Sequence, residues 1–141
     1  MKNKDNIFGI IFLVLGALLS AGTAWIFPVC GPKDDGSWMK CHWSSQALIG
    51  IGVVLVVLAV AYLIVPQRHA KAGMSLAIIP VGLFAIAVPN GLIGLCGMAE
   101  MQCRATTQPA VTIISAAIVL LAAFNAIRLF RMEPKRETDK K

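Results

Sequence analysis

The sequence predicts an all-α membrane protein with four transmembrane helices, arranged as two tandem hairpins that repeat in parallel. The first observation is composition: the 141-residue chain is 57% hydrophobic and only 14% charged, whereas soluble domains carry about 25% charged residues. The second is that the apolar residues collect in four long runs. The third is a cysteine pattern that follows both the first and the third run. Together they predict a single membrane domain over residues 1–141.

Each of the four runs is long enough to cross a bilayer, which takes about 20 apolar residues in a helix. The runs are Ile7–Phe27, Ala47–Val65, Met74–Leu95 and Ala110–Phe130. None of them contains Asp, Glu or Lys. Backbone groups in lipid must find partners within their own segment, so the runs are predicted to be helices. The single charge, Arg128, lies near the end of the fourth run, where its side chain can snorkel to the headgroups.

Three of the runs carry a feature of their own. The first follows Lys2 and Lys4, as a secretory signal would; we interpret it as a permanent helix because the third run holds the same place in the second copy of the pattern. In the third run, Pro89-Asn90-Gly91 predicts a kink or an early helix end. In the fourth run, Asn125 predicts a hydrogen bond between helices.

The distribution of Lys and Arg predicts the orientation, because cytoplasmic loops carry an excess of these residues. One side of the bundle has Lys2, Lys4, Arg68, Lys71, Arg128, Arg131, Lys135, Arg136, Lys140 and Lys141, and the other has Lys33, Lys40 and Arg104. We therefore expect both termini to be cytoplasmic and both cysteine loops to face outward. Residues 132–141 are expected to form a flexible cytoplasmic tail. The formal charge of +6 is then a signal of topology, and we expect no nucleic-acid partner.

The repeated pattern is found in the two outward loops. Cys30-Gly31 followed by Met39-Lys40-Cys41-His42 is matched by Cys96-Gly97 followed by Met101-Gln102-Cys103-Arg104. The first loop is the longer one, with its extra residues around Lys33–Ser37. In the register that aligns Cys41 with Cys103, Tyr62 also meets Phe124. Two repeats, of about 7–66 and 74–131, would each cross the membrane twice, so they would be parallel repeats about an axis along the membrane normal.

Four cysteines in outward loops indicate an oxidising environment. The repeat favours local disulfides, Cys30–Cys41 and Cys96–Cys103, each worth about 3 kcal/mol in the chain-entropy model. Thiol–disulfide chemistry is one alternative, since Cys41 and Cys103 lie a few residues before apolar runs and helix starts favour thiolates. Soft-metal or haem binding is another, because the two loops hold a set of soft ligands suited to copper or an iron porphyrin: Met39, Cys41, His42, Met98, Met101 and Cys103. His42 is replaced by Arg104 in the second copy, so the candidate contacts are Met39, His42, Met101 and Arg104.

Polar residues at the start of the second and fourth runs suggest helix caps. The triplets Ser44-Ser45-Gln46 and Thr106-Thr107-Gln108 are typical of N-caps and capping boxes. Pro109 then suits an early helical position. Nothing in the sequence resembles a nucleophile–base pair, and no catalytic residue is predicted.

Two resemblances bear on function. The plan of four helices with a cysteine pair in each outer loop is similar to that of quinone-coupled disulfide-forming membrane oxidoreductases, but those use Cys-x-x-Cys, which this chain lacks. The two loops, from Cys30 to Trp43 and from Cys96 to Pro109, resemble those of a prokaryotic family of short four-helix membrane proteins of unknown function. The second resemblance implies a prokaryotic cytoplasmic membrane and supplies no catalytic residue.

The sequence therefore predicts a small multi-pass protein that acts as a non-enzymatic accessory subunit of a membrane assembly, such as a transporter. Its partners would be the lipid bilayer and other membrane subunits, and it would need no cofactor. A membrane thiol–disulfide oxidoreductase and an extracytoplasmic binder of copper or haem remain the alternatives.

Overall fold

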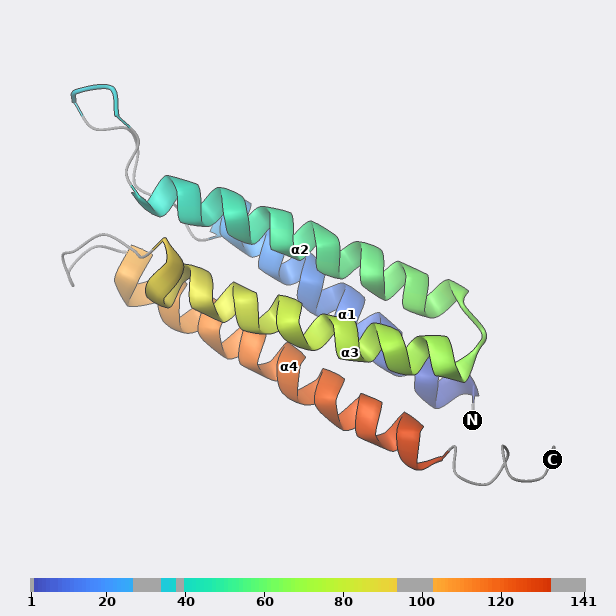
Figure 1. Cartoon of the computed structure of the whole chain (residues 1–141). Helices are drawn as coiled ribbons and strands as arrows, with labels where there is room; N and C mark the ends of the chain where they lie inside the picture. Colours follow the sequence, from blue (N-terminus) through green and yellow to red (C-terminus); the bar gives the residue numbers. More distant parts are fainter. Residues whose placement is uncertain (1, 27–33, 38–39, 94–102, 133–141) are drawn as a thin grey trace.

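The computed structural model describes residues 2–26, 34–37, 40–93 and 103–132. Over these residues the regular secondary structure is helical throughout, and four long helices form an elongated bundle (Figure 1). The helices are α1 (Lys2–Ala21), α2 (Lys40–Ile64), α3 (Arg68–Ala87) and α4 (Gln108–Arg131). α1 packs along α2 and α3 packs along α4, and the two hairpins meet where α2 contacts α3 and α1 contacts α4.

The two ends of the bundle differ in what they carry. We call the end where α1 begins and α4 ends the terminal end, and the opposite end, where α2 begins, the cysteine end (Figure 1). Short π-helical segments lie at the cysteine end. They are η1 (Gly22–Ile26) after α1, η2 (Val88–Leu92) after α3 and η3 (Cys103–Thr107) before α4.

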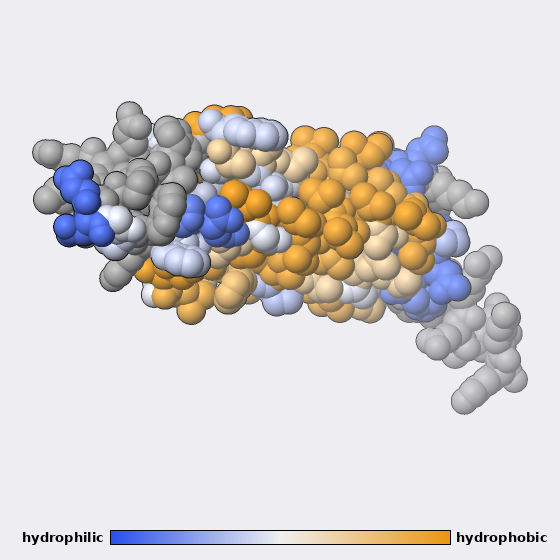
Figure 2. All heavy atoms as spheres, turned by 90° about the horizontal axis from the view of Figure 1, so that it is seen from above, coloured by the Kyte–Doolittle hydropathy of each residue, from blue (hydrophilic) through white to orange (hydrophobic). Residues whose placement is uncertain are grey.

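All four helices are long and apolar enough to cross a membrane, with spans over Asn3–Ile26, His42–Ile64, Arg68–Leu92 and Arg104–Arg131. Large apolar side chains cover much of the outer surface, and the face in Figure 2 shows an apolar band between hydrophilic ends. Water cannot solvate a surface of this kind over four helices, whereas lipid can. The chain is thus a multi-pass membrane protein, as the sequence predicted.

Buried residues recur along each helix at alternating spacings of three and four, which is the pattern of helices packed at a shallow left-handed crossing angle. On α1 and η1 they include Asp5, Gly9, Phe12, Gly16, Leu19 and Thr23. On α3 and η2 they include Lys71, Ser75, Ile78, Gly82, Ala85 and Pro89. The large apolar members of both sets belong to the core between the hairpins.

Glycines let the backbones of each hairpin approach closely. A Cβ atom on Gly52 of α2 would lie 2.7 Å from Cβ and 2.9 Å from Cα of Ser20 on α1. One on Gly16 would lie 3.2 Å from the backbone nitrogen of Val56. In α3, a Cβ atom on Gly82 would lie 2.6 Å from the side-chain Cγ2 of Val119 on α4 and 3.6 Å from the backbone oxygen of Ser115. Small residues at such crossings are the usual means of helix association in membranes, because they bring the backbones into van der Waals contact.

Three helices begin more than one turn earlier than the apolar runs predicted, and this is the main correction to the expected fold. α1 begins at Lys2, α2 at Lys40 and α3 at Arg68. The added turns contain polar and charged residues that hydropathy alone assigns to loops. At the other end of α3 the predicted break is present: the α-helix ends at Ala87 and the π-helical segment η2 follows. Pro80 lies inside α3, which continues past it.

Candidate functional site

The second cysteine of each loop lies at the start of a helical segment. Cys41 is the second residue of α2 and Cys103 is the first residue of η3, and both segments begin at the cysteine end (Figure 1). His42 follows in α2, with its ring 5.9 Å from the ring of Trp43 in an edge-to-face arrangement. Arg104 is exposed in η3. Cys30, Met39, Cys96 and Met101 lie outside the described residues, so the pairing of the cysteines and the ligand set remain predictions.

Among the described residues, no group of three or more His, Cys, Asp or Glu side chains is placed so that it could hold a metal ion. The methionines named for copper or haem binding lie outside the described residues. A soft-metal or haem site at the cysteine end therefore stays a proposal.

The predicted helix caps are wrong for the first triplet. α2 begins at Lys40, so Ser44 and Ser45 lie inside the helix and are buried. Ser45 donates a hydrogen bond to the backbone oxygen of Thr23 at 3.5 Å, which ties the start of α2 to η1. In the second triplet, Thr107 does occupy the N-cap position of α4 but makes no side-chain cap bond. The caps are absent because helical structure starts earlier than the apolar run does.

A second polar contact ties α4 to η2. Gln108 at the start of α4 donates through Nε2 to Oδ1 of Asn90 at 2.8 Å. Asn90 donates in turn to the backbone oxygen of Ile86 at 2.7 Å and to the Thr112 hydroxyl at 3.4 Å. Each hairpin is thus fastened at the cysteine end by a polar link between its two helices. These links hold together the helix ends to which the two cysteine loops are joined in the sequence.

At the terminal end the bundle encloses a polar group that we call the inner cluster, comprising Asp5, Tyr62, Lys71, Ser75, Asn125 and Arg128. Arg128 of α4 pairs with Asp5 of α1, with Nη2 and Oδ1 3.5 Å apart. The guanidinium also lies 5.6 Å from the centre of the Phe8 ring. The predicted snorkelling of Arg128 to the headgroups is therefore wrong, because its side chain is only 18% exposed and turns toward α1.

Asn125 forms the bond between helices that the sequence predicted. Its Nδ2 lies 2.9 Å from the hydroxyl of Tyr62 on α2 and 2.9 Å from that of Ser75 on α3. Asn125 and Ser75 are fully buried, as is Tyr62. Asn125 Oδ1 has no hydrogen-bond partner among the described residues. One buried amide thus joins three helices and leaves one acceptor unpaired.

Lys71 completes the inner cluster and was not foreseen, because it lies just before the third apolar run. The residue is only 6% exposed. Its ammonium lies 5.0 Å from the centre of the Tyr62 ring. The spacing of core positions in the sequence could have predicted both buried charges. Asp5 and Lys71 each lie two core positions before an apolar core residue, Phe12 and Ile78 respectively.

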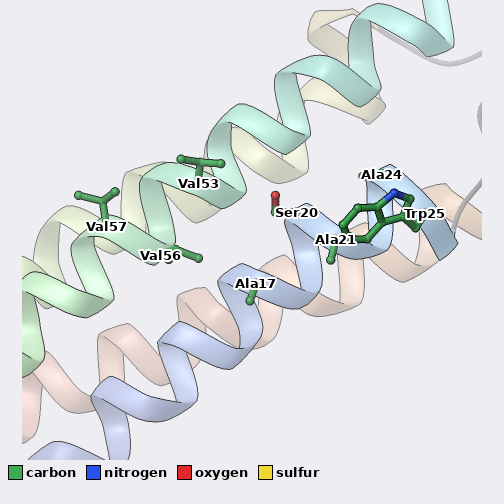
Figure 3. A pocket seen from close by; sticks show the side chains of 8 residues that line it. All are labelled: Ala17, Ser20, Ala21, Ala24, Trp25, Val53, Val56 and Val57. Carbon is green, nitrogen blue, oxygen red and sulfur yellow. The ribbon is translucent and has the colours of Figure 1, made fainter.

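A groove opens on the side of the first hairpin, toward the cysteine end (Figure 3). It has a volume of about 310 Å³. From α1 and η1 it is lined by Ala17, Ser20, Ala21, Ala24 and Trp25, and from α2 by Val53, Val56 and Val57. The α1 side is made of small residues at helical spacing, so a neighbouring helix could approach its backbone closely.

A family model described as a domain of unknown function (DUF4418) matches residues 12–128. The chain belongs to this DUF4418 family. The match runs from Phe12 to Arg128 and therefore includes both cysteine loops and the groove. No curated protein and no solved structure matches the chain. The DUF4418 family is described as having no known function, so membership assigns no activity to the chain. The function is therefore argued from the site itself.

Proposed function

We propose that the protein is a non-enzymatic subunit of a larger membrane assembly, and that the groove on α1 and α2 receives a transmembrane helix of the partner. The observation that carries the proposal is the groove itself. It lies between two membrane spans, so its occupant is embedded in lipid. Four small residues of α1 and η1 line it on one side: Ala17, Ser20, Ala21 and Ala24 (Figure 3). Of these, Ser20 supplies a hydroxyl group. Such a face favours a helix over acyl chains because backbones can come into contact.

A comparison of the two hairpins supports the proposal that the groove receives a partner helix. The register that aligns Cys30 with Cys96 also aligns the bounds of α1 with those of α3, and the bounds of η1 with those of η2. The buried positions of α1 recur in α3 in this register, from Asp5 and Lys71 onward. This agreement favours the predicted tandem repeat. The groove departs from it: Ala17 and Ser20 correspond to Leu83 and Ile86, whose larger side chains would fill such a face.

The second helix of each hairpin, α2 and α4, is compared next. The buried positions of α2 match those of α4 when the two sequences are shifted by one residue from the register that aligns Cys41 with Cys103. Leu48, Leu55 and Ala59 are buried, and their counterparts Val111, Ile118 and Ala122 are buried too. Tyr62 then corresponds to Asn125, to which it is bonded, and not to Phe124, which is 62% exposed. A π-helical turn holds one residue more than an α-helical turn, so η3 can absorb the difference.

The orientation that we propose has the terminal end in the cytoplasm and the cysteine end outside, in a prokaryotic cytoplasmic membrane. It rests on the excess of Lys and Arg beside the terminal end. Local disulfides in the outer loops would add to the polar links that fasten each hairpin there. The outer half of the protein would then be a rigid surface for a partner.

Measuring the mass of the native complex tests the proposal. The 15.0 kDa chain is extracted from its own membrane in mild detergent, together with an Ala17→Leu variant that fills the groove and an Ala77→Leu control. Both alanines are exposed on their helices, so neither substitution disturbs the core. We expect one partner polypeptide, at fixed stoichiometry, with the parent chain and the control, and none with Ala17→Leu. A chain that runs alone, or only with copies of itself, would contradict the proposal.

A thiol–disulfide oxidoreductase is the second candidate, supported by the position of Cys41 and Cys103 at the starts of helical segments, where a helix favours a thiolate. Thiol labelling before and after reduction separates the candidates. A mixture of reduced and oxidised pairs is expected of an oxidoreductase, and fully oxidised pairs of structural disulfides. Copper or haem binding would instead appear as stoichiometric metal in elemental analysis.

A further inference from the structure

Lys71 is a buried cation without an anion beside it. It is 6% exposed, and among the described residues its ammonium has a ring contact with Tyr62 but no ion pair. Buried charges in proteins are as a rule paired, because removal of an ion from water costs several kcal/mol. The inner cluster holds one acidic residue, Asp5, and Arg128 already pairs with it. The cluster therefore contains two cations and a single anion.

The start of α3 adds a second, independent reason to expect an anion. Its first turn contains no acidic residue, and Gln67 at the N-cap makes no side-chain cap hydrogen bond. Arg68 and Lys71 place positive charge at the positive end of the helix dipole, which is unfavourable. The first N–H groups of a helix have no partner within it, so this end attracts anions. In a helix the side chain of Lys71 tilts back toward those N–H groups.

The corresponding position in the first hairpin shows the contrast. Asp5, the counterpart of Lys71 in the repeat, is buried in the first turn of α1, where an acidic residue suits the dipole, and Arg128 neutralises it. At the buried position of its first turn, α1 thus carries an anion, whereas α3 carries there a cation that no described residue neutralises.

We infer that the start of α3 binds the phosphate headgroup of an anionic phospholipid, with Lys71 as the central contact. Lys71 is the fourth residue of the span Arg68–Leu92, so it lies about 5 Å inside the helix start at 1.5 Å per residue. In a bilayer that is entered at the start of this span, such a depth lies in the headgroup region, which is about 5–8 Å thick on each side. Arg68 is exposed next to it and can contact the same phosphate. Basic sites between transmembrane helices hold headgroups in this manner.

The test uses the full chain, delipidated in a zwitterionic detergent. Phosphatidylglycerol, phosphatidylcholine or inorganic phosphate is added to the parent chain, to Lys71→Met and to a control, Lys4→Met, whose lysine is exposed on the first turn of α1. Thermal unfolding and native mass spectrometry report binding. We expect phosphatidylglycerol, but not phosphatidylcholine, to raise the Tm and to be retained by the parent and the control. For Lys71→Met we expect at least a tenfold loss of apparent affinity.

Three results would overturn the inference. Equal binding of phosphatidylglycerol by Lys71→Met would show that Lys71 is not the contact. A Tm raised by inorganic phosphate but not by phosphatidylglycerol would show that the anion is not a lipid. The third result concerns the stability of the lipid-free protein. The inference predicts that Lys71→Met is then at least as stable as the parent, because the substitution removes an unpaired buried charge. A variant that is less stable, or fails to fold, would show that the chain itself compensates Lys71.

Discussion

The side-chain nitrogen of Asn125 lies 2.9 Å from the hydroxyl oxygen of Tyr62, and this contact joins α4 of the second hairpin to α2 of the first. The hairpins otherwise meet mainly through apolar side chains. Lipid competes for apolar surfaces of this kind, so polar contacts between helices give the interface its specificity.

The first prediction concerns this contact. A double-mutant cycle of Tyr62→Phe and Asn125→Leu, measured by unfolding in mixed micelles, should give a coupling energy of about 0.6 kcal/mol, the average for hydrogen bonds between membrane helices. The control cycle pairs Tyr62→Phe with Ser115→Ala, since Ser115 is a buried hydroxyl of α4 without a bond to Tyr62. Coupling in the control but not in the Asn125 cycle would refute the contact.

The ion pair of the inner cluster gives the second prediction. Asp5→Asn should destabilise the bundle by about 2 kcal/mol, because the Arg128 guanidinium then lacks its counter-charge in a largely buried site. Exchanging the two charges, with Asp5→Arg and Arg128→Asp in one chain, should recover part of the loss. The unfolding free energies of the single and double variants provide the measurement. An exchange no more stable than the worse single variant would count against the pair.

A third prediction follows from the crossing of α1 and α2. Gly52→Ala should destabilise the first hairpin by about 1–3 kcal/mol, because its Cβ would lie 2.7–2.9 Å from atoms of Ser20 that include backbone. Gly50→Ala is the matched control on the same helix, since a Cβ there meets nothing within 4 Å. The control should be neutral or slightly stabilising, because alanine has the higher helix propensity. Equal effects at the two glycines would contradict the packing.

The fourth prediction concerns orientation. A short epitope inserted after Gly36, which lies between α1 and α2, should be detected by antibody on intact spheroplasts. The same epitope after Pro66, between α2 and α3, should be detected only once the membrane is permeabilised. Gly36 and Pro66 are exposed and lie outside the helices, so both insertions leave the helices and the Gln67 N-cap of α3 in place. The reverse pattern would mean that the charge bias does not set the topology.

Hydropathy was sufficient to predict the four spans, because a lipid-facing helix needs little more than apolar length. It failed at Asp5 and Lys71, since it assigns charged residues to loops even where a neighbouring helix can enclose them. The role of Asn125 was predictable because an amide in lipid must find a partner. The groove was not, as small residues are common in all membrane helices and only the packing shows which face stays open. The predicted role of the cysteine loops stays a prediction, because it depends largely on residues outside the described ranges.

A photoreactive side chain placed in the groove tests the proposed subunit role most directly. p-Benzoylphenylalanine is introduced at Ala17 and, as the control, at Ala77, which is likewise exposed but lies on α3. The groove proposal predicts that irradiation of native membranes joins the Ala17 variant, and not the Ala77 variant, to the single polypeptide found in the native complex. Adducts with lipid alone, or equal cross-linking from both positions, would contradict it.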